Sequence, residues 1–200
     1  INNQKIIERV IISFSTDPYP PEEIKECLTR SVLAKLKETC HNIYVLTKNP
    51  RLALRDIDLY RDTWLLGSTV IVLKKTDLEP YAPPPRDRLN ALREASGSVA
   101  TWLSVEPIIP GVTNVTKIVE ETLDYVGFYV FGKLNYAPQL GFKYSVTPEV
   151  LEDVATAVRL LEEVGTPYYV KKELWWKYLK PYLESLKIDY SGVTQLCVYS

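Results

Sequence analysis

The chain has 200 residues, of which 46% are hydrophobic and 24% are charged, and this composition fits one globular domain with a sizeable core. Its 24 Lys and Arg residues nearly balance its 25 Asp and Glu residues, which excludes a globally basic nucleic-acid-binding protein and leaves only a local basic patch. No apolar run approaches the roughly 18 residues that a membrane helix needs, so we expect no membrane partner.

The counts of cysteine, histidine and methionine further limit which metal sites and disulfides the chain can form. Cys27, Cys40 and Cys197 stand in no metal-binding spacing and suggest no disulfide framework, which is typical of a reduced, cytoplasmic protein. His41 is the only histidine, so a site built from several histidines is excluded. The sequence contains no Met and starts with Ile1, which indicates a processed or truncated N-terminus, or methionines left out of the sequence.

The first half of the chain alternates between apolar runs and segments with helical periodicity. A helix is predicted over 22–38, because Ile24, Leu28, Val32 and Leu36 share one face at a spacing of four residues. Asn49 before Pro50 predicts an N-cap and a helix start, and another helix follows the three prolines at 83–85. The strands predicted here cover 6–15, 43–46 and 67–73.

The second half continues the same alternation. Thr147 before Pro148 predicts the start of a helix whose inward residues are Val150, Val154, Ala157 and Leu161. The other helices predicted here cover 115–123 and 173–186. The predicted strands cover 99–105, 126–134 and 166–170, with a terminal strand at 191–198.

Repeated strand–helix units with almost continuously apolar strands predict an α/β fold with a parallel sheet and outer helices. A complete eight-fold barrel needs about 250 residues. We therefore expect a partial (β/α)6-type TIM-like barrel, with residues 1–200 as a single domain and an open doubly wound sheet as the alternative. The chain has neither a G-x-G-x-x-G sequence nor a Walker sequence, which weakens a dinucleotide or P-loop assignment.

Polar residues follow or end each apolar run. Because the carboxyl ends of parallel strands meet on one face of the sheet, we expect these residues to converge on one pocket. Side chains alternate along a strand, so Ser104 and Glu106 should point the same way, as should Lys133 and Asn135. The residues at the six strand ends are Ser15, Thr16 and Asp17; Thr47 and Lys48; Ser68 and Thr69; Ser104 and Glu106; Lys133 and Asn135; Lys171 and Lys172.

Structural interpretations compete with this one. Asp17 before Pro18 can form an Asx-turn, and Glu106 can pair with Lys133 in a salt bridge without chemistry. Cys27 and Cys40 are expected to be buried thiols, and Arg86, Arg88 and Arg93 to lie on a solvated helix face. The lysines and aromatic residues of 171–180 can form a nucleic-acid platform, or they can divide into an aromatic core side and a solvated lysine side.

Taken in order, several short motifs resemble the radical SAM superfamily, specifically the spore photoproduct lyase-like group known as DNA repair photolyases. The resemblance covers about residues 10–175. Its motifs are Ser15-Thr16-Asp17-Pro18-Tyr19, Leu46-Thr47-Lys48, Leu54-Arg55-Asp56-Ile57-Asp58-Leu59, Leu78-Glu79-Pro80-Tyr81-Ala82-Pro83, Arg88-Leu89-Asn90-Ala91-Leu92, Thr101-Trp102-Leu103-Ser104-Val105-Glu106-Pro107, Gly132-Lys133-Leu134-Asn135-Tyr136 and Tyr168-Tyr169-Val170-Lys171-Lys172.

The resemblance implies a partial barrel of about six β/α units with S-adenosylmethionine bound across the carboxyl ends of the strands. A [4Fe–4S] cluster would cleave the sulfonium to a 5′-deoxyadenosyl radical, with ferredoxin or flavodoxin as the electron donor. By carry-over, Ser15, Thr16 and Asp17 would lie at the methionine amino group, and Lys48 would meet the carboxylate. Thr69, Ser104 and Asn135 join these cofactor-binding residues, while Glu106 and Lys133 are the expected catalytic residues beside the ribose or substrate.

The family binds its cluster through three cysteines spaced C-x-x-x-C-x-x-C, and this chain has no such motif. We expect the cluster loop and its strand to lie upstream of Ile1, so the chain alone should not perform radical chemistry. Spore photoproduct lyase also has a hydrogen-donating cysteine at the strand that here reads Ser13-Phe14-Ser15, which argues against repair of thymine dimers.

Two other functions remain open. One is a barrel enzyme that forms a Schiff base at Lys48, Lys133 or Lys171. The other is a non-catalytic barrel that binds a nucleotide or nucleic acid through its aromatic and basic C-terminal helix.

Overall fold

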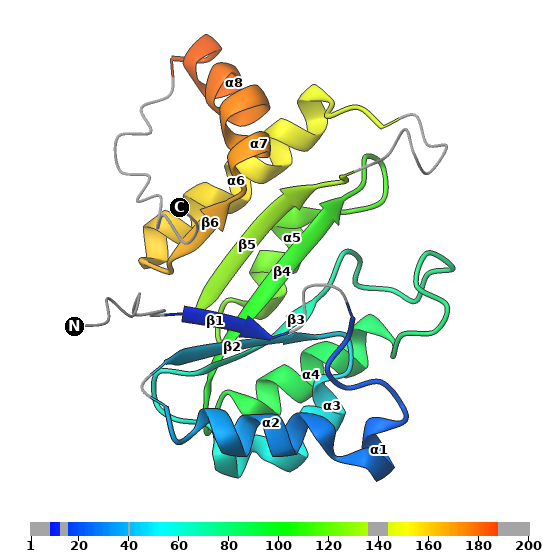
Figure 1. The fold of residues 1–200 in the computed structure, drawn as a ribbon. Coiled ribbons are helices and arrows are strands. Elements are labelled where there is room, and N and C mark those ends of the chain that lie inside the picture. Colours follow the sequence, from blue (N-terminus) through cyan, green and yellow to red (C-terminus); the bar gives the residue numbers. More distant parts are fainter. Residues whose placement is uncertain (1–8, 13–15, 40, 136–143, 188–200) are drawn as a thin grey trace, which may run out of the picture.

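Six strands form a single curled sheet. The structure is a computed structural model that describes residues 9–12, 16–39, 41–135 and 144–187. Each strand pairs in parallel with the next strand along the chain, and the sheet curls into a half-barrel (Figure 1). This confirms the predicted α/β partial barrel. The strands are β1 (Arg9–Ile12), β2 (Asn42–Thr47), β3 (Leu65–Thr69), β4 (Ala100–Ile108), β5 (Phe128–Lys133) and β6 (Tyr168–Val170).

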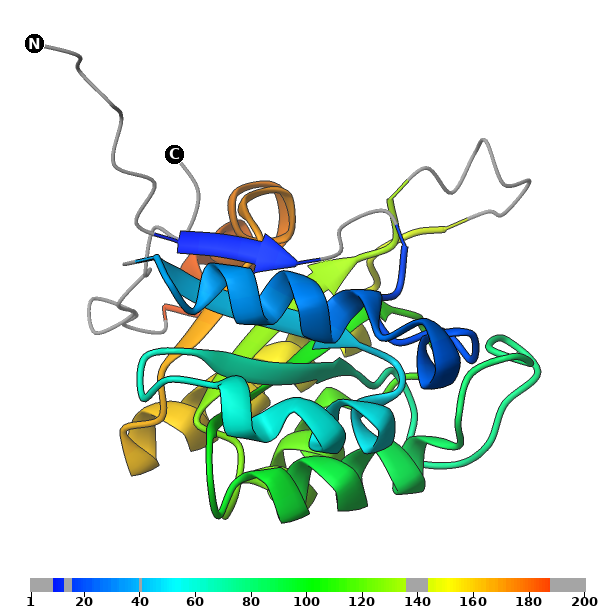
Figure 2. The same ribbon diagram turned by 60° about the horizontal axis from the view of Figure 1, so that its bottom comes forward.

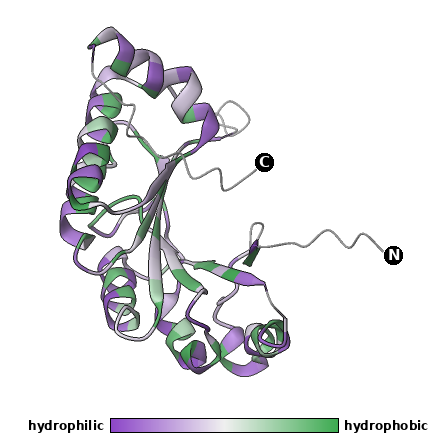
Figure 3. Cartoon of the chain, turned by 90° about the vertical axis from the view of Figure 1, so that its left-hand side faces the viewer, coloured by the Kyte–Doolittle hydropathy of each residue, from purple (hydrophilic) through white to green (hydrophobic). Residues whose placement is uncertain are grey.

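The helices line the outer, convex side of the half-barrel, as the side view of Figure 3 and the turned view of Figure 2 show. They are α1 (Glu23–Glu26), α2 (Leu28–Leu36), α3 (Pro50–Ala53), the 3₁₀ helix η1 (Leu54–Leu59), α4 (Pro85–Ala95), α5 (Val115–Thr122), α6 (Pro148–Val164), α7 (Lys172–Leu174), the π-helical turn η2 (Trp175–Leu179) and α8 (Lys180–Ser185). Within the ranges given above, no helix has the length and hydropathy needed to cross a membrane.

The main core lies between the sheet and these helices. Because side chains alternate along a strand, every second residue of a strand faces the helix layer. From the strands this core takes Ile43, Val45, Leu66, Leu103, Val105, Tyr129, Phe131 and Val170, and from the helices Leu33, Leu92, Val119 and Leu161. All of these residues are buried, and the alternation of apolar side chains along the strands therefore reflects burial of the convex face of the sheet against the helices.

The alternate residues of the same strands form a second, smaller cluster on the concave face. Its buried members are Trp102, Phe128, Val130 and Tyr169, with Leu46 and Leu65 packed against them. Trp102 and Phe128 lie in tilted contact, with their ring centroids 6.3 Å apart. This cluster gives the concave face an apolar floor, whereas the described helices pack against the other face of the sheet.

Helix ends in the second half follow the predicted signals. The Thr147 hydroxyl accepts a hydrogen bond from the Val150 amide (3.5 Å), and α6 ends at Gly165, whose φ of 73° suits a residue without a side chain. The predicted inward residues of α6, from Val150 to Leu161, are buried. Asn49 is the N-cap residue of α3 and Pro50 its first residue, as the sequence predicts, although the Asn49 side chain makes no capping hydrogen bond and its Nδ2 donates instead to the Tyr19 carbonyl (3.1 Å).

The prediction of one continuous helix over 22–38 is wrong. The chain breaks at Cys27, which adopts a left-handed conformation (φ 52°), and α1 and α2 are separate helices. The break changes the phase of the helix, so Ile24, Leu28 and Val32 remain 65%, 65% and 49% exposed. Leu33 faces the core in their place, and of the predicted stripe only Leu36 packs against it.

Two other expectations change in detail. The helix predicted over 173–186 contains the π-helical turn η2, which directly precedes Pro181 in α8; proline has no amide hydrogen to donate to the preceding turn. Arg88 does not lie on a solvated face but is 1% exposed, whereas Arg86 and Arg93 are exposed and paired with Glu121 and Asp124. The strand predicted at 191–198 lies outside the described residues.

Several tyrosines have their phenol groups in the core. Burial is the largest cause of a raised pKa at each of them, and it brings the pKa of Tyr125 to about 12. Tyr129 bonds to the Thr122 hydroxyl (2.8 Å), and Tyr19 donates to Asp56 (3.1 Å). The tyrosines with raised pKa values are Tyr19, Tyr60, Tyr125, Tyr129, Tyr144 and Tyr168.

Trp102 reaches across the concave face because Gly67 has no side chain. The two residues are partners in the β3–β4 register, and a Cβ atom on Gly67 would lie 2.3 Å from the indole Nε1 of Trp102. The indole passes over Gly67 and donates to the Val45 carbonyl of β2 (3.1 Å). The floor of the concave face therefore depends on this close approach.

The raised tyrosine pKa values predict loss of stability at alkaline pH. The unfolded chain loses phenol protons at about pH 10, whereas the folded chain keeps them to higher pH. The stability from these groups is therefore complete below about pH 10 and falls as the pH rises through the folded-state values. Absorbance at 295 nm followed together with circular dichroism should show the buried tyrosines ionising only as the fold is lost. Ionisation of all 14 tyrosines near pH 10 with intact structure would contradict this.

Gly67→Ala should destabilise the fold by about 1–3 kcal/mol, because the new methyl group must displace the Trp102 indole. The matched control is Gly97→Ala, where the nearest atom to a Cβ is 3.8 Å away and the expected change is under about 0.5 kcal/mol. Urea unfolding measures both free energies. Equal effects at the two glycines would show that the close approach to Trp102 has no energetic consequence.

Candidate functional site

The concave face holds a pocket of about 690 Å³ that runs along the strands to their carboxyl-terminal ends. This volume is in the usual range for a small-molecule site. The pocket is lined from the strands and the segments that follow them by Ile11, Tyr44, Leu46, Thr69, Trp102, Ser104, Glu106, Phe128, Val130, Lys133, Asn135, Tyr169, Lys171, Lys172, Glu173 and Leu174. Seven of the residues predicted at the strand ends thus come together: Thr69, Ser104, Glu106, Lys133, Asn135, Lys171 and Lys172.

The lining changes from apolar to polar along the strand direction. On β4, Trp102, Ser104 and Glu106 face the pocket in that order towards the carboxyl end. On β5, Phe128 and Val130 come first and Lys133 follows. A ligand with an aromatic or apolar body and a polar end matches this gradient.

The Glu106 carboxylate lies over Gly132. A Cβ atom on Gly132 would come within 2.6 Å of the Glu106 Cδ, so the glycine leaves room for the carboxylate to cross β5. Beyond it, Glu106 Oε2 meets the Lys171 ammonium group at 2.5 Å. Because Gly132 has no side chain, the Glu106 side chain can lie across β5 at the polar end of the pocket.

The lysine on β5 has a different partner. Lys133 Nζ pairs with Glu173 (3.1 Å) and donates to the Leu134 carbonyl (3.3 Å), and its side chain is 13% exposed. The expected Glu106–Lys133 pair is therefore replaced by two pairs, Glu106–Lys171 and Lys133–Glu173. A Schiff base at Lys133 or Lys171 would have to break one of these ion pairs.

Four uncharged polar groups of the pocket have no hydrogen bond within the described residues: the Tyr44, Thr69 and Ser104 hydroxyls and the Asn135 side-chain amide. Ser104 is only 3% exposed, so its hydroxyl faces the pocket and not bulk solvent. By contrast, the neighbouring Ser68 is buried on the convex side and donates to the Thr47 carbonyl (2.7 Å). Thr69 and Ser104 can therefore donate to or accept from a ligand.

Of the residues predicted at the first two strand ends, Thr16, Asp17, Thr47 and Lys48 do not line the pocket. Asp17 accepts from the Thr47 hydroxyl (2.5 Å), the Lys48 amide (2.6 Å) and the Tyr19 amide (2.9 Å), the last being the expected Asx-turn. The Lys48 ammonium group pairs with Glu79 (2.7 Å), and Thr16 is exposed. Ser15 lies outside the described residues.

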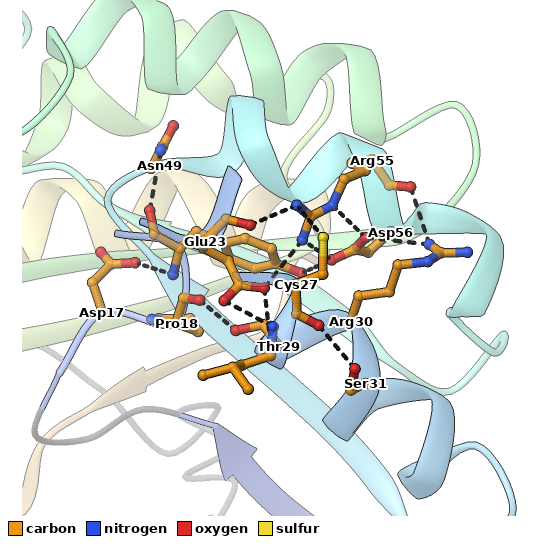
Figure 4. A network of polar contacts seen from close by, with 12 residues as sticks. Asp17, Pro18, Glu23, Cys27, Thr29, Arg30, Ser31, Asn49, Arg55 and Asp56 are labelled. Atoms are coloured by element: carbon orange, nitrogen blue, oxygen red, sulfur yellow. Dashed lines mark hydrogen bonds and ion pairs between the residues drawn. The ribbon is translucent and has the colours of Figure 1, made fainter. Parts of the chain in front are cut away.

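Asp17 belongs to a polar network that holds the β1–α1 connection against η1 (Figure 4). The Glu23 carboxylate accepts from the Leu28 and Thr29 amides at the start of α2 (3.1 and 2.8 Å). Arg55 pairs with both Glu23 (3.2 Å) and the fully buried Asp56 (2.8 Å). These contacts satisfy the helix end at the Cys27 break, so the network is structural.

The described residues do not fit a three-cysteine iron–sulfur cluster. They contain no group of three or more His, Cys, Asp and Glu residues arranged to hold a metal ion. Cys27 is half-buried at the α1–α2 junction, with its sulfur 3.6 Å from Arg55 Nη1. Cys40 and Cys197 lie outside the described residues.

The C-terminal helical segment separates its aromatic and basic residues only in part. Trp175 is buried in the main core, whereas Trp176 is 55% exposed and lies 4.6 Å from the Lys180 ammonium group. Lys177 lies 5.5 Å from the ring of Tyr178. The expected division into a core side and a lysine side therefore holds for Trp175 but not for Trp176.

Lys171 and Lys172, expected at the sixth strand end, both line the pocket, whereas Tyr169 on the preceding strand was not predicted for the site. Lys172, at the start of α7, makes no ion pair within the described ranges, so it can meet a ligand carboxylate. Tyr169 adds an aromatic ring from β6. Alternation within Tyr168–Val170 could have identified Tyr169, since its neighbours face the core.

The Glu106–Lys171 pair should show a coupling free energy of about 0.5–1 kcal/mol in a double-mutant cycle of Glu106→Gln and Lys171→Met, measured by urea unfolding. Gly132→Ala should abolish the coupling by displacing the carboxylate. The control is the Lys35–Glu38 pair, whose side chains are 81% and 70% exposed and whose coupling should be near zero. Equal coupling in the two pairs would contradict the arrangement described above.

Comparisons with known proteins give relatives without an assigned activity. No protein-family model matches the chain. The uncharacterized protein MJ0683 of Methanocaldococcus jannaschii is 29% identical over 176 residues, covering 82% of this chain and 67% of that protein. The uncharacterized protein ORF301 of Acidianus two-tailed virus is 26% identical over 187 residues, covering 84% of this chain and 61% of that protein. The chain is thus similar to part of each of these two longer proteins.

Proposed function

We propose that the concave pocket binds S-adenosylmethionine, as the ligand-binding half-barrel of a radical SAM-type protein. The observation that carries this proposal is the pair of uncommitted hydroxyls, Thr69 and Ser104, above an aromatic floor in a pocket of about 690 Å³. The motifs of the resemblance also supply nine residues of this pocket: Leu46, Trp102, Ser104, Glu106, Lys133, Asn135, Tyr169, Lys171 and Lys172.

The chemistry of the ligand matches the gradient of the pocket. Trp102, Phe128 and Tyr169 offer apolar and aromatic surface for an adenine ring. Thr69 and Ser104 offer hydroxyls to the ribose and amino groups, and the Glu106 carboxylate can accept from either. Lys172 offers an ammonium group to the ligand carboxylate, a role that the sequence had suggested for Lys48.

Bound S-adenosylmethionine supplies a reactive sulfonium centre. A radical reaction also requires an iron–sulfur cluster, and the described residues do not hold one. We therefore propose that the described residues bind and orient the ligand, and we propose no substrate. Lys48, Lys133 and Lys171, the lysines considered for a Schiff base, are all ion-paired, so a Schiff-base enzyme is the less favoured function.

Binding of S-adenosylmethionine to the purified chain tests this proposal by isothermal titration calorimetry. Thr69→Val and Ser104→Ala should each weaken binding on the order of fivefold to tenfold, because each removes one hydrogen bond to the ligand. Thr63→Val is the matched control, since Thr63 is exposed in a turn away from the pocket. It should change the affinity by less than about twofold.

Two results would overturn the proposal. One is the absence of saturable binding by a chain whose circular dichroism shows the native fold. The other is binding that neither Thr69→Val nor Ser104→Ala alters. Reductive trapping of a carbonyl compound on Lys133 or Lys171 by borohydride would instead support the Schiff-base alternative.

A further inference from the structure

A second pocket, of about 360 Å³, lies outside the half-barrel between the β3–α4 connection and the start of α5. The connection projects beyond the start of α4, as the teal-to-green loop of Figure 2 shows. We call this the basic pocket. It is lined by Val72, Leu73, Lys74, Lys75, Thr76, Arg86, Val112, Asn114, Lys117 and Ile118. None of these residues lines the concave pocket.

Four of the ten lining residues are cationic, and none is acidic. Lys74, Lys75 and Lys117 are exposed and make no ion pair or hydrogen bond through their ammonium groups within the described part of the chain. Arg86 is the exception, because Glu121 pairs with it. The whole chain carries 24 basic and 25 acidic residues, so this concentration of positive charge is local.

The start of helix α5 is itself already occupied. Asp153 accepts from the Val115 and Thr116 amides (2.6 and 2.9 Å), and Asn114 Oδ1 accepts from the Lys117 amide (2.8 Å). The available donors of the basic pocket are therefore side-chain groups: the three ammonium groups and the Asn114 Nδ2. They stand around an apolar floor of Val72, Leu73 and Ile118.

We propose that the basic pocket binds adjacent phosphate groups of a polyanionic ligand. Like charges held together raise the local potential and attract an anion, and lysine ammonium groups on flexible stems suit phosphate oxygens. Three lysines that make no ion pair within the described residues match a ligand with more than one negative charge. Two sources share this chemistry, the backbone of a nucleic acid and a free di- or triphosphate. The proposal does not depend on the function of the concave pocket.

Binding of inorganic pyrophosphate and of a short single-stranded oligothymidylate to the purified chain tests the proposal at low ionic strength. The double variant Lys74→Ala/Lys117→Ala should weaken pyrophosphate binding on the order of tenfold. The matched control is Lys25→Ala/Lys35→Ala, which removes the same charge from α1 and α2 and should change the affinity by less than about twofold. Circular dichroism of each variant checks that the fold is kept.

The oligonucleotide distinguishes the two sources. If it binds, is displaced by pyrophosphate and loses about 1.4 units of salt dependence in the Lys74→Ala/Lys117→Ala variant, the phosphate groups are those of a nucleic acid. Binding of pyrophosphate alone, with the same loss in the variant, supports a free phosphorylated ligand. The proposal is overturned if neither probe binds, or if both double variants weaken binding equally, since that would reflect only the overall charge.

Discussion

Parallel pairing of six consecutive strands is the constraint on which the rest of the structure depends. Each strand must be followed by a connection from its carboxyl end back to the amino end of the next strand, and such crossover connections are right-handed. The helices therefore lie on the convex side, where every second strand residue is buried against them. The other strand side chains point to the concave face, and the carboxyl ends of all six strands lie at the same end of the sheet. The pocket is a consequence of this arrangement, because its polar residues lie where the strands end.

Within that frame, β4 supplies both the floor and the polar edge of the pocket by placing two side chains over glycines of its neighbours. Trp102 crosses Gly67 of β3 and reaches the Val45 carbonyl, and Glu106 crosses Gly132 of β5 and reaches Lys171. A side chain at either glycine would occupy the space of the group that now lies there. The two glycines thus fix the shape of the pocket although neither contributes a side chain to it.

The fold could be predicted from the sequence because strand alternation and helix caps are local patterns. The convergence of Thr69, Ser104, Glu106, Lys133 and Asn135 also followed, since it needs only parallel strands and alternation. Contacts between distant segments could not be predicted in this way. Asp17 is held by Thr47 and Lys48, and Glu23 by Arg55, and no spacing within the sequence reveals either pairing. The break at Cys27, which exposes Ile24, Leu28 and Val32, has the same origin, because Glu23 caps the second helix from outside it.

The two pockets differ in how their charges are compensated, and this difference decides how each can recognise a ligand. In the concave pocket, Glu106 and Glu173 neutralise Lys171 and Lys133, and Lys172 is the lysine without an ion pair among the described residues. Uncharged hydroxyls and aromatic surface must therefore provide most of the selectivity there, and such contacts respond little to salt. In the basic pocket, Lys74, Lys75 and Lys117 make no ion pair within the described residues, so attraction of an anion is long-ranged and is screened by salt. The half-barrel therefore has one surface that recognises a ligand by shape and hydrogen bonding and another that attracts a ligand by its charge. The two surfaces consist of separate sets of residues.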